Sequence, residues 1–545
     1  MPSATPQTSR VRPLPLSGLL RLGRPSDIWY KPALSVVVAV APPNLALLAL
    51  GRLDLAAYTM AGSLCALYAH NRPYAARART LAWVVLGMVA GLAVALATAS
   101  LTTDAVVLVT VGALLAAVQK MLCDATRIGP PGNVIFTFIT SASLFVPQTL
   151  GQVPGHVGLA AAAGVWSWLV GMAPGLLRPH GPERRATAHA LLTTAAFAET
   201  RTAASRAGAA AVVHTAWQTL LFTGARSAPR RALERLVVRA EVALAAPTDS
   251  DPERLRAWAR ALRGTGPVPE PDDLGDAADD LLGVEAELDS PARPLHRRLG
   301  PLAPLALRTA LGCALAGYVS LALGIGRPYW ALVTAAALYQ ANVTLTWRRG
   351  VQRVVGNLVG VLLFAAIAPL AHLSDLALIL CGLAFNFGAE ALISRNYWLG
   401  SVCVTPMALL ITEFGHYQEP GALMADRVLD TLVGALIGFV AAIAVTNRRA
   451  GDRIEHALAT VDSARERAAA VVSAERPDPG ALEAARRALV AAVVDLRAAA
   501  DAAAGEWWLA ALPEERVLRA EQAGHRTLAA TIRRQGLHIS EGART

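Results

Sequence analysis

The sequence predicts an all-α fold: a polytopic membrane protein with two six-helix transmembrane bundles related as a parallel repeat, plus a cytoplasmic helical domain and tail. Hydrophobic residues make up 54% of the 545 residues and charged residues only 17%, whereas a soluble domain carries about 25% charged residues. The apolar residues fall in runs of about 20, the length of a helix that crosses a bilayer. The second half also repeats features of the first.

The apolar runs predict twelve spans, six in each half. The first six cover about 32–50, 54–70, 81–100, 104–122, 132–148 and 156–177. The second six cover about 303–324, 328–346, 353–371, 375–393, 397–413 and 427–446. Basic residues gather in alternate loops, as at Arg72, Arg77 and Arg79. Since positive loops stay inside, we expect a multi-pass protein of the cell (inner) membrane with both termini in the cytoplasm.

Five parts follow from this division. They are a cytoplasmic N-terminal segment (1–31), the first bundle (32–178), a cytoplasmic helical domain (179–301), the second bundle (302–447) and a cytoplasmic helical tail (448–545). The two cytoplasmic parts are rich in Ala, Arg and Glu at helical spacing, as in 231–246 and 251–263. Gly264–Asp276, Pro477–Gly480 and Pro513 predict breaks between their helices.

Two motifs occur in both halves and suggest the repeat. A-L-Y-x-x-N ends the second run of each half, at Tyr68 and at Tyr339. G-x-x-x-G, which lets two helices approach closely in lipid, occurs in the third and sixth runs: Gly87 and Gly91, Gly356 and Gly360, Gly171 and Gly175, Gly434 and Gly438. The alternative is chance matching in a chain rich in glycine and alanine. We interpret these glycines as helix-packing positions.

The charge and cysteine pattern narrows the function class. The net charge is +10, but the arginines flank apolar runs, so we expect contact with anionic lipid and no nucleic acid. The five cysteines form no C-x-x-C pair and lie in or beside apolar runs, which is typical of buried free thiols. No Walker A, nucleophile-elbow, metalloprotease or dinucleotide motif occurs, so we expect no enzyme, no cofactor and no metal site.

The best candidates for substrate binding lie at the start of the second half. They are Tyr329, Trp330, Tyr339, Gln340, Asn342, Thr344, Arg349 and Arg353. On one continuous helix, Gln340 and Thr344 would share a face. A guanidinium pairs well with a carboxylate, and aromatic rings can stack on an aromatic substrate. The alternative is topological, because aromatic residues also anchor spans and arginines also mark the inner side.

Two carboxylates are candidates for proton coupling. Glu390 lies near the inner end of the tenth run, where the fourth run has Lys120. Asp430 follows Arg427 by nearly one turn and could pair with it. Ionisable groups in a span are costly and therefore suggest function. The alternative for Glu390 is a residue at the end of a helix that reaches the membrane surface.

One stretch of the second half resembles the signature of the fusaric-acid-resistance-like family of aromatic acid exporters. It begins with Arg327-Pro328-Tyr329-Trp330 and continues with Gln340, Thr344, Arg349, Arg353 and Gly356-Asn357-Leu358-Val359-Gly360. The motif covers about 325–445, and the layout of the whole chain also matches. Asn357 stands where the family usually has Thr, and the first half lacks the Pro-Tyr-Trp motif. The resemblance implies export of small, often aromatic, carboxylic acids driven by the proton gradient.

The leading hypothesis is therefore a proton-coupled secondary transporter that exports small organic acids. An anion channel is the first alternative, and a structural or regulatory membrane protein that acts through its cytoplasmic helices is the second. The expected partners are membrane lipid and a small organic anion. A second copy of the chain, or another protein, is the expected partner of the cytoplasmic helices.

Overall fold

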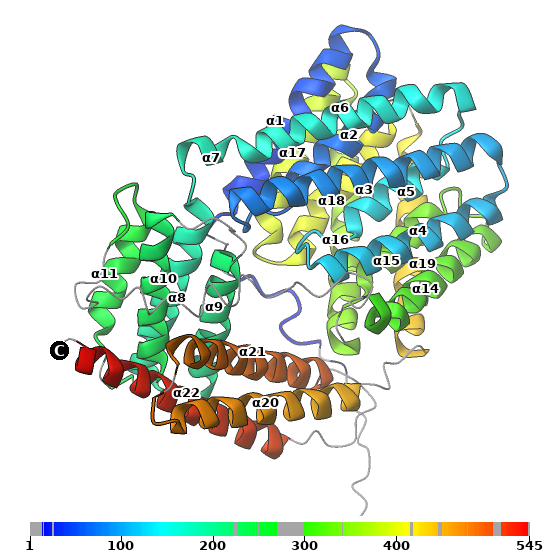
Figure 1. Ribbon diagram of the computed structural model, residues 1–545. Coiled ribbons are helices and arrows are strands. Elements are labelled where there is room, and N and C mark those ends of the chain that lie inside the picture. The colour runs from blue at the N-terminus through cyan, green and yellow to red at the C-terminus, as the bar shows by residue number, and fades with distance from the viewer. Residues whose placement is uncertain are drawn as a thin grey trace, which may run out of the picture.

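The computed structural model describes residues 14–542, apart from 15, 24, 26, 222–226, 246, 249, 270–298, 341, 415–417, 445–449, 477 and 505–513. All regular elements in the described residues are helices, so the predicted all-α fold is confirmed. Figure 1 shows a large body of helices and, at one end of it, a second group formed by α8–α11 and α20–α22. Some of the predicted features lie outside the described residues. They are most of the segment 1–31, the breaks at Pro477 and Pro513, and the part of Gly264–Asp276 after residue 269.

Eight helices among the described residues are long and apolar enough to cross a membrane. They are α1 (Tyr30–Ala49), α3 (Tyr74–Leu101), α4 (Ala105–Thr126), α6 (Val153–Met172), α14 (Ala303–Ala322), α16 (Val343–Ala371), α17 (Asp375–Ile393) and α19 (Pro420–Ala444). Large apolar side chains stay exposed on them, for example Trp83 at 71%, Leu362 at 71% and Leu436 at 64%. Apolar surface of this kind is stable only against lipid tails.

The other four predicted spans are helical but short. Leu53–Leu67 consists of η1 (Leu53–Leu55), α2 (Ala56–Ser63) and η2 (Leu64–Leu67); the others are α5 (Val134–Leu144), α15 (Tyr329–Leu338) and α18 (Tyr397–Thr412). At 1.5 Å per residue, helices of this length reach about 15–25 Å, less than the roughly 30 Å of hydrocarbon. The prediction of a membrane span is therefore not confirmed for these four segments, although α18 has the predicted bounds within one residue. Each of them is the second or fifth of its half.

The A-L-Y-x-x-N motif marks the place where the second helix of each half stops. Tyr68 caps η2 with extended backbone (ψ 154°), and Ala69 follows with a φ of +62°. Tyr339 caps α15 with extended backbone (ψ 112°), and Asn342 caps the next helix. The motif is thus a break between a short helix and a long one rather than the end of a continuous span.

The two halves interlock through their helices. The first helix of each half packs against the fourth helix of the other, as α1 on α17 and α14 on α4. At the second contact, Thr110 Oγ1 and Tyr318 Oη are 2.7 Å apart. The second helix of the later half, α15, also packs against α5 of the earlier half. The two predicted bundles therefore form one helical body, and their relation as a parallel repeat stays a prediction.

The predicted packing glycines lie at close contacts between helices. A Cβ on Gly356 or Gly360 of α16 would come within 2.5 Å of Ser401 Cβ and 2.7 Å of Thr405 Cβ in α18. The pair Gly87 and Gly91 in α3 meets Phe136 and Thr140 of α5, and the pair Gly434 and Gly438 in α19 meets α15. Gly171 and Gly175 meet Leu81 and Tyr74 of α3. The third helix of each half thus packs on the fifth through its glycine pair.

The second group of helices has two apolar cores of its own. Helices α8 (Gly181–Thr200), α9 (Ala203–Leu221), α10 (Ala228–Ala245) and α11 (Pro252–Arg263) share the first core. Helices α20 (Ala450–Ser473), α21 (Pro479–Ala504) and α22 (Glu514–Gly542) share the second. The helices predicted at 231–246 and 251–263 are confirmed as α10 and α11, with bounds that differ by at most three residues. α9 packs on α21 and α10 on α22, so the central domain and the tail lie on the same side of the apolar body.

A buried ion pair joins these two cores. Arg486 of α21 is 1% exposed and its Nη1 lies 2.7 Å from Oε2 of Glu241 in α10. Trp217 Nε1 donates to the other carboxylate oxygen at 2.8 Å, and the guanidinium of Arg487 lies 4.0 Å above the Trp217 ring. These groups are desolvated together, so each depends on the others for its hydrogen bonds.

Replacing Arg486 with alanine should detach the tail from the central domain. Removing one partner of a buried pair leaves the other charge uncompensated and costs about 3–5 kcal/mol. Arg516→Ala is the matched control, since Arg516 also pairs with a glutamate on another helix (Glu455, 2.7 Å) but is 58% exposed; that loss should be below about 1 kcal/mol. Thermolysin cleavage of the purified full-length variants measures both effects, and equal cleavage rates would contradict the role given to Arg486.

Candidate functional site

The predicted substrate residues fall into two groups at opposite ends of α15. Tyr329 and Trp330 begin this helix, and Tyr339 follows its last residue. Ten residues at 1.5 Å each separate the two ends by about 15 Å. The prediction that these residues act together is therefore not supported by their positions, and each group has its own surroundings.

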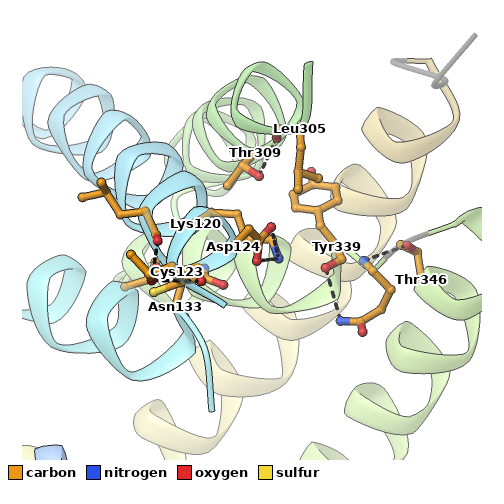
Figure 2. A network of polar contacts seen from close by, with 12 residues as sticks. Lys120, Cys123, Asp124, Asn133, Leu305, Thr309, Tyr339 and Thr346 are labelled. Carbon is orange, nitrogen blue, oxygen red and sulfur yellow. Dashed lines mark hydrogen bonds and ion pairs between the residues drawn. The ribbon is translucent and has the colours of Figure 1, made fainter. Parts of the chain in front are cut away.

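The group after α15 holds the break together. The main-chain N–H of Gln340 donates to Thr346 Oγ1 at 3.2 Å, and Gln340 Nε2 donates to the carbonyl of Tyr339 at 3.2 Å (Figure 2). Asn342 caps α16 by accepting from the N–H of Leu345 at 2.8 Å. Thr344 lies in the first turn of α16, so it does not share a helix with Gln340 as predicted.

Tyr339 points at α14 rather than at the other aromatic candidates. A Cβ at Gly312 of α14 would fall 1.6 Å from Tyr339 Oη, so only glycine leaves room for this ring. In α14, Thr309 Oγ1 donates to the carbonyl of Leu305 at 2.9 Å, as Figure 2 shows. The close fit of Tyr339 against Gly312 and the hydrogen bonds of Gln340 and Asn342 are consistent with a structural role for the break.

The group at the start of α15 forms a buried aromatic cluster. Trp330 is 1% exposed, stacks on Phe138 of α5 at a centroid distance of 5.5 Å, and lies 4.9 Å from the ring of Tyr329. Tyr329 in turn lies 5.7 Å from the ring of Phe145. Both halves of the chain thus contribute rings to this cluster. The first-half residues carried no signal in the sequence that set them apart from other apolar residues of a span.

Arg427 of α19 lies directly against this cluster. Its guanidinium carbon is 3.9 Å from the centroid of the Trp330 ring, and the side chain is 1% exposed. Its Nη2 donates to Asn357 Oδ1 at 3.3 Å, while Nε and Nη1 are buried without a hydrogen-bond partner. A cation in this state is costly unless an anion completes its hydrogen bonds. The sequence had suggested Arg427 as an ion-pair partner for Asp430 and not as a member of the substrate site.

Asn357 connects three helices beneath Arg427. Its Oδ1 accepts from Thr405 Oγ1 of α18 as well as from Arg427, and its Nδ2 donates to Thr431 Oγ1 of α19 at 2.9 Å. A threonine, which the resemblance implies at this position, would offer one hydroxyl where the Asn357 amide has a separate acceptor oxygen and donor nitrogen. The departure from the family pattern therefore falls on the residue that positions Arg427.

Two more arginines lie on α16 beside Tyr397. Arg353 is 5% exposed, and it donates through Nη1 to Tyr397 Oη at 2.8 Å and through Nε to Thr334 Oγ1 at 3.4 Å. The guanidinium carbon of Arg349 lies 3.3 Å from the centroid of the Tyr397 ring, and its Nε is buried without a hydrogen-bond partner. We call Arg349, Arg353, Arg427, Trp330 and Asn357 the arginine cluster.

Asp430 is the buried carboxylate nearest to the arginine cluster along the chain. It is fully buried, and Oδ1 accepts from Ser320 Oγ of α14 at 2.5 Å while Oδ2 has no hydrogen-bond partner. The suggested ion pair with Arg427 is not formed. The other arginine near this end, Arg327, pairs instead with Asp426 at 2.5 Å.

Glu390 lies apart from these residues, on α17, and is half-buried. In the described structure it makes no hydrogen bond or ion pair, and no described contact joins it to the arginine cluster. Asp430 and Glu390 therefore occupy different surroundings, although the sequence placed both in the same role. No group of three or more metal-binding side chains occurs among the described residues.

The fold and these buried polar groups define a multi-pass membrane protein whose apolar helices are in contact with lipid. Residues 314–441, which hold the arginine cluster, match the model of the family described as fusaric acid resistance protein-like, so the resemblance noted in the sequence is confirmed for this region. The match spans α15, α16, α17 and α18, and parts of α14 and α19.

Two curated relatives are similar to part of the chain. An uncharacterized membrane protein of Bacillus subtilis, YvaC, is 32% identical over 156 residues, which are 28% of this chain and 25% of the relative. An uncharacterized protein of Haemophilus influenzae is 31% identical over 140 residues, which are 25% of this chain and 18% of the relative. The chain thus aligns with about a quarter or less of each relative. No solved structure matches significantly.

Proposed function

We propose that this chain is a proton-coupled secondary transporter of the cell membrane that exports small organic acids, aromatic carboxylates among them. The observation that carries the proposal is Arg427, a buried cation with two hydrogen-bond donors, Nε and Nη1, left without partners. The fusaric acid resistance protein-like match of the surrounding residues supports a membrane transporter.

The chemistry of the arginine cluster favours an aromatic anion. A carboxylate has two acceptor oxygens and supplies the partners that Arg427 lacks. The rings of Trp330 and Tyr329 lie beside this guanidinium and offer aromatic faces for a ring attached to the carboxylate. Arg349 and Arg353 add positive charge on the neighbouring helix, so an anion is attracted toward Arg427.

Asp430 is the stronger of the two candidates for carrying a proton. Its free Oδ2 can take up a proton without breaking the hydrogen bond from Ser320 to Oδ1. The change in its charge alters the electrostatic field at Arg427, less than one helical turn away, and so links proton binding to anion binding. Glu390 remains the second candidate.

Uptake of radiolabelled benzoate into inverted membrane vesicles tests this function. We expect uptake that collapses with an uncoupler, loss of the coupled component in Asp430→Asn, and no change in Asp375→Asn, whose carboxylate is exposed at the start of α17. Loss of the uncoupler-sensitive uptake in Glu390→Gln would show that Glu390 also takes part in proton coupling. Current or flux that persists with the uncoupler would identify a channel, and neither flux nor current with any aromatic acid of a panel would leave a structural or regulatory role.

A further inference from the structure

A cavity of about 690 Å³ lies where the apolar body meets helices α8–α11, which we call the polar helices. It is bounded by the segment before α1, the end of α7 (Pro174–Leu177), the start of α8, the start of α10 and the segment after α11. Its lining is strongly basic. The cationic lining residues are Lys31, Arg178, Arg184, Arg185 and Arg263, and Asp27 is the acidic one.

The positive charge of this basic cavity is mostly uncompensated. Arg263 pairs with Asp27 at 3.3 Å, and Arg184 donates to three main-chain carbonyls, among them that of Leu262 at 3.1 Å. Lys31 and Arg178 make no side-chain hydrogen bond or ion pair in the described structure. Burial also lowers the pKa of Arg184 and Arg185, because their charged form loses water there. An anion in the cavity would relieve these costs together.

The cavity lies at the level of the membrane surface. Tyr30 and Leu177, which both line it, are 43% and 87% exposed, and their neighbours Trp29 and Leu176 are 37% and 89% exposed. Exposed tryptophan and tyrosine at the start of a span are typical of the headgroup region, and exposed leucines require lipid tails. The basic lining therefore lies next to the phosphates of the bilayer.

We propose that the basic cavity binds the phosphate-bearing headgroup of an anionic membrane lipid. The first N–H groups of α8 add to the positive potential, because Gly181 lines the cavity and begins that helix. A lipid fits better than a soluble phosphate compound, because the exposed leucines beside the opening give its acyl chains an apolar surface. The bound lipid connects α1 of the apolar body with α8 and α11 of the polar helices.

The test removes two cationic side chains that make no hydrogen bond or ion pair in the described structure. Lys31→Gln combined with Arg178→Gln removes the unpartnered charges of the cavity without breaking a contact. Arg79→Gln combined with Arg348→Gln is the matched control, since both are exposed and likewise make no described side-chain contact. Binding of phosphatidylglycerol to the purified full-length proteins in detergent is measured by the shift of the thermal unfolding midpoint along a lipid titration.

We expect phosphatidylglycerol to stabilise the native protein and the control variant, and phosphatidylcholine to have little effect. Each basic residue near an anionic surface changes affinity about fivefold, so the cavity variant should bind phosphatidylglycerol about 25-fold more weakly. Equal binding by the two double variants, or equal effects of the two lipids, would overturn the proposal. Equal stabilisation by inorganic phosphate would assign the cavity to a soluble anion instead, and displacement of the lipid by benzoate would assign it to the transport path.

Discussion

Arg427→Gln is expected to reduce benzoate transport by about a hundredfold or more while the protein remains folded in the membrane. Each hydrogen bond from a charged donor contributes about 1.5–3 kcal/mol. The substitution removes Nε and Nη1 of Arg427, the two donors proposed to bind the carboxylate. Glutamine is two bonds shorter than arginine, so the substitution also removes the hydrogen bond to Asn357, whose Oδ1 still accepts from Thr405. Because Arg427 is a buried cation without an ion-pair partner, its loss should leave the thermal unfolding midpoint unchanged or raise it.

The control for this prediction is Arg348→Gln, which removes an exposed arginine from α16. Transport by this variant should stay within about twofold of the native protein, because a solvated charge at the surface is strongly screened. Benzoate uptake and thermal unfolding are measured on the same preparations. If Arg427→Gln lowered the unfolding midpoint and left transport per folded molecule intact, the arginine would serve the structure and not the substrate.

Gly434→Ala should strongly destabilise the apolar body. An added Cβ would lie 2.4 Å from the carbonyl oxygen of Ala331 and 2.8 Å from Thr334 Cβ, both in α15. Backbone atoms cannot turn away as a flexible side chain can, so α15 and α19 must separate. Overpacking of this kind costs about 1–3 kcal/mol, although the same substitution in an open helix position stabilises by up to about 1 kcal/mol.

The matched control is Gly158→Ala in α6, where no atom lies within 4 Å of an added Cβ. This variant should be as stable as the native protein or slightly more stable. The two glycine substitutions are therefore expected to change the free energy of unfolding in opposite directions. Thermal unfolding in detergent and the yield of monodisperse protein from membranes measure the difference. Similar midpoints for the two variants would show that α19 does not depend on close contact with α15.

The sequence predicted all twelve apolar segments because the length of an apolar run is a local property. It did not predict that two of them, α5 and α15, stop after 11 and 10 residues. The breaks after Tyr68 and Tyr339 lie inside apolar surroundings, where composition does not distinguish a continued helix from a turn. Asn342 capping α16 is a signal that could have been used, since an asparagine before a new helix is a frequent N-cap.

The candidate site was predicted in part. Trp330, Arg353 and Asp430 were recognised as unusual, and all three are buried near the start of α15 or along α16 and α19. Tyr339, Gln340 and Asn342 were assigned to the same site but lie at the other end of α15. Arg427 was suggested as an ion-pair partner for Asp430, and its contacts with Trp330 and Asn357 are shown only by the structure.

The sequence by itself determined the fold class, the positions of the apolar helices and the glycines at which they touch, since each depends on residues close together in the chain. The tertiary structure alone decided that the halves interlock, with α1 on α17 and α14 on α4. It also decided that Arg427 meets Trp330 and Asn357, which lie on two other helices, and that Lys31 and Arg178 share a cavity. Contacts between distant segments depend on how helices pack, which no local pattern of residues records.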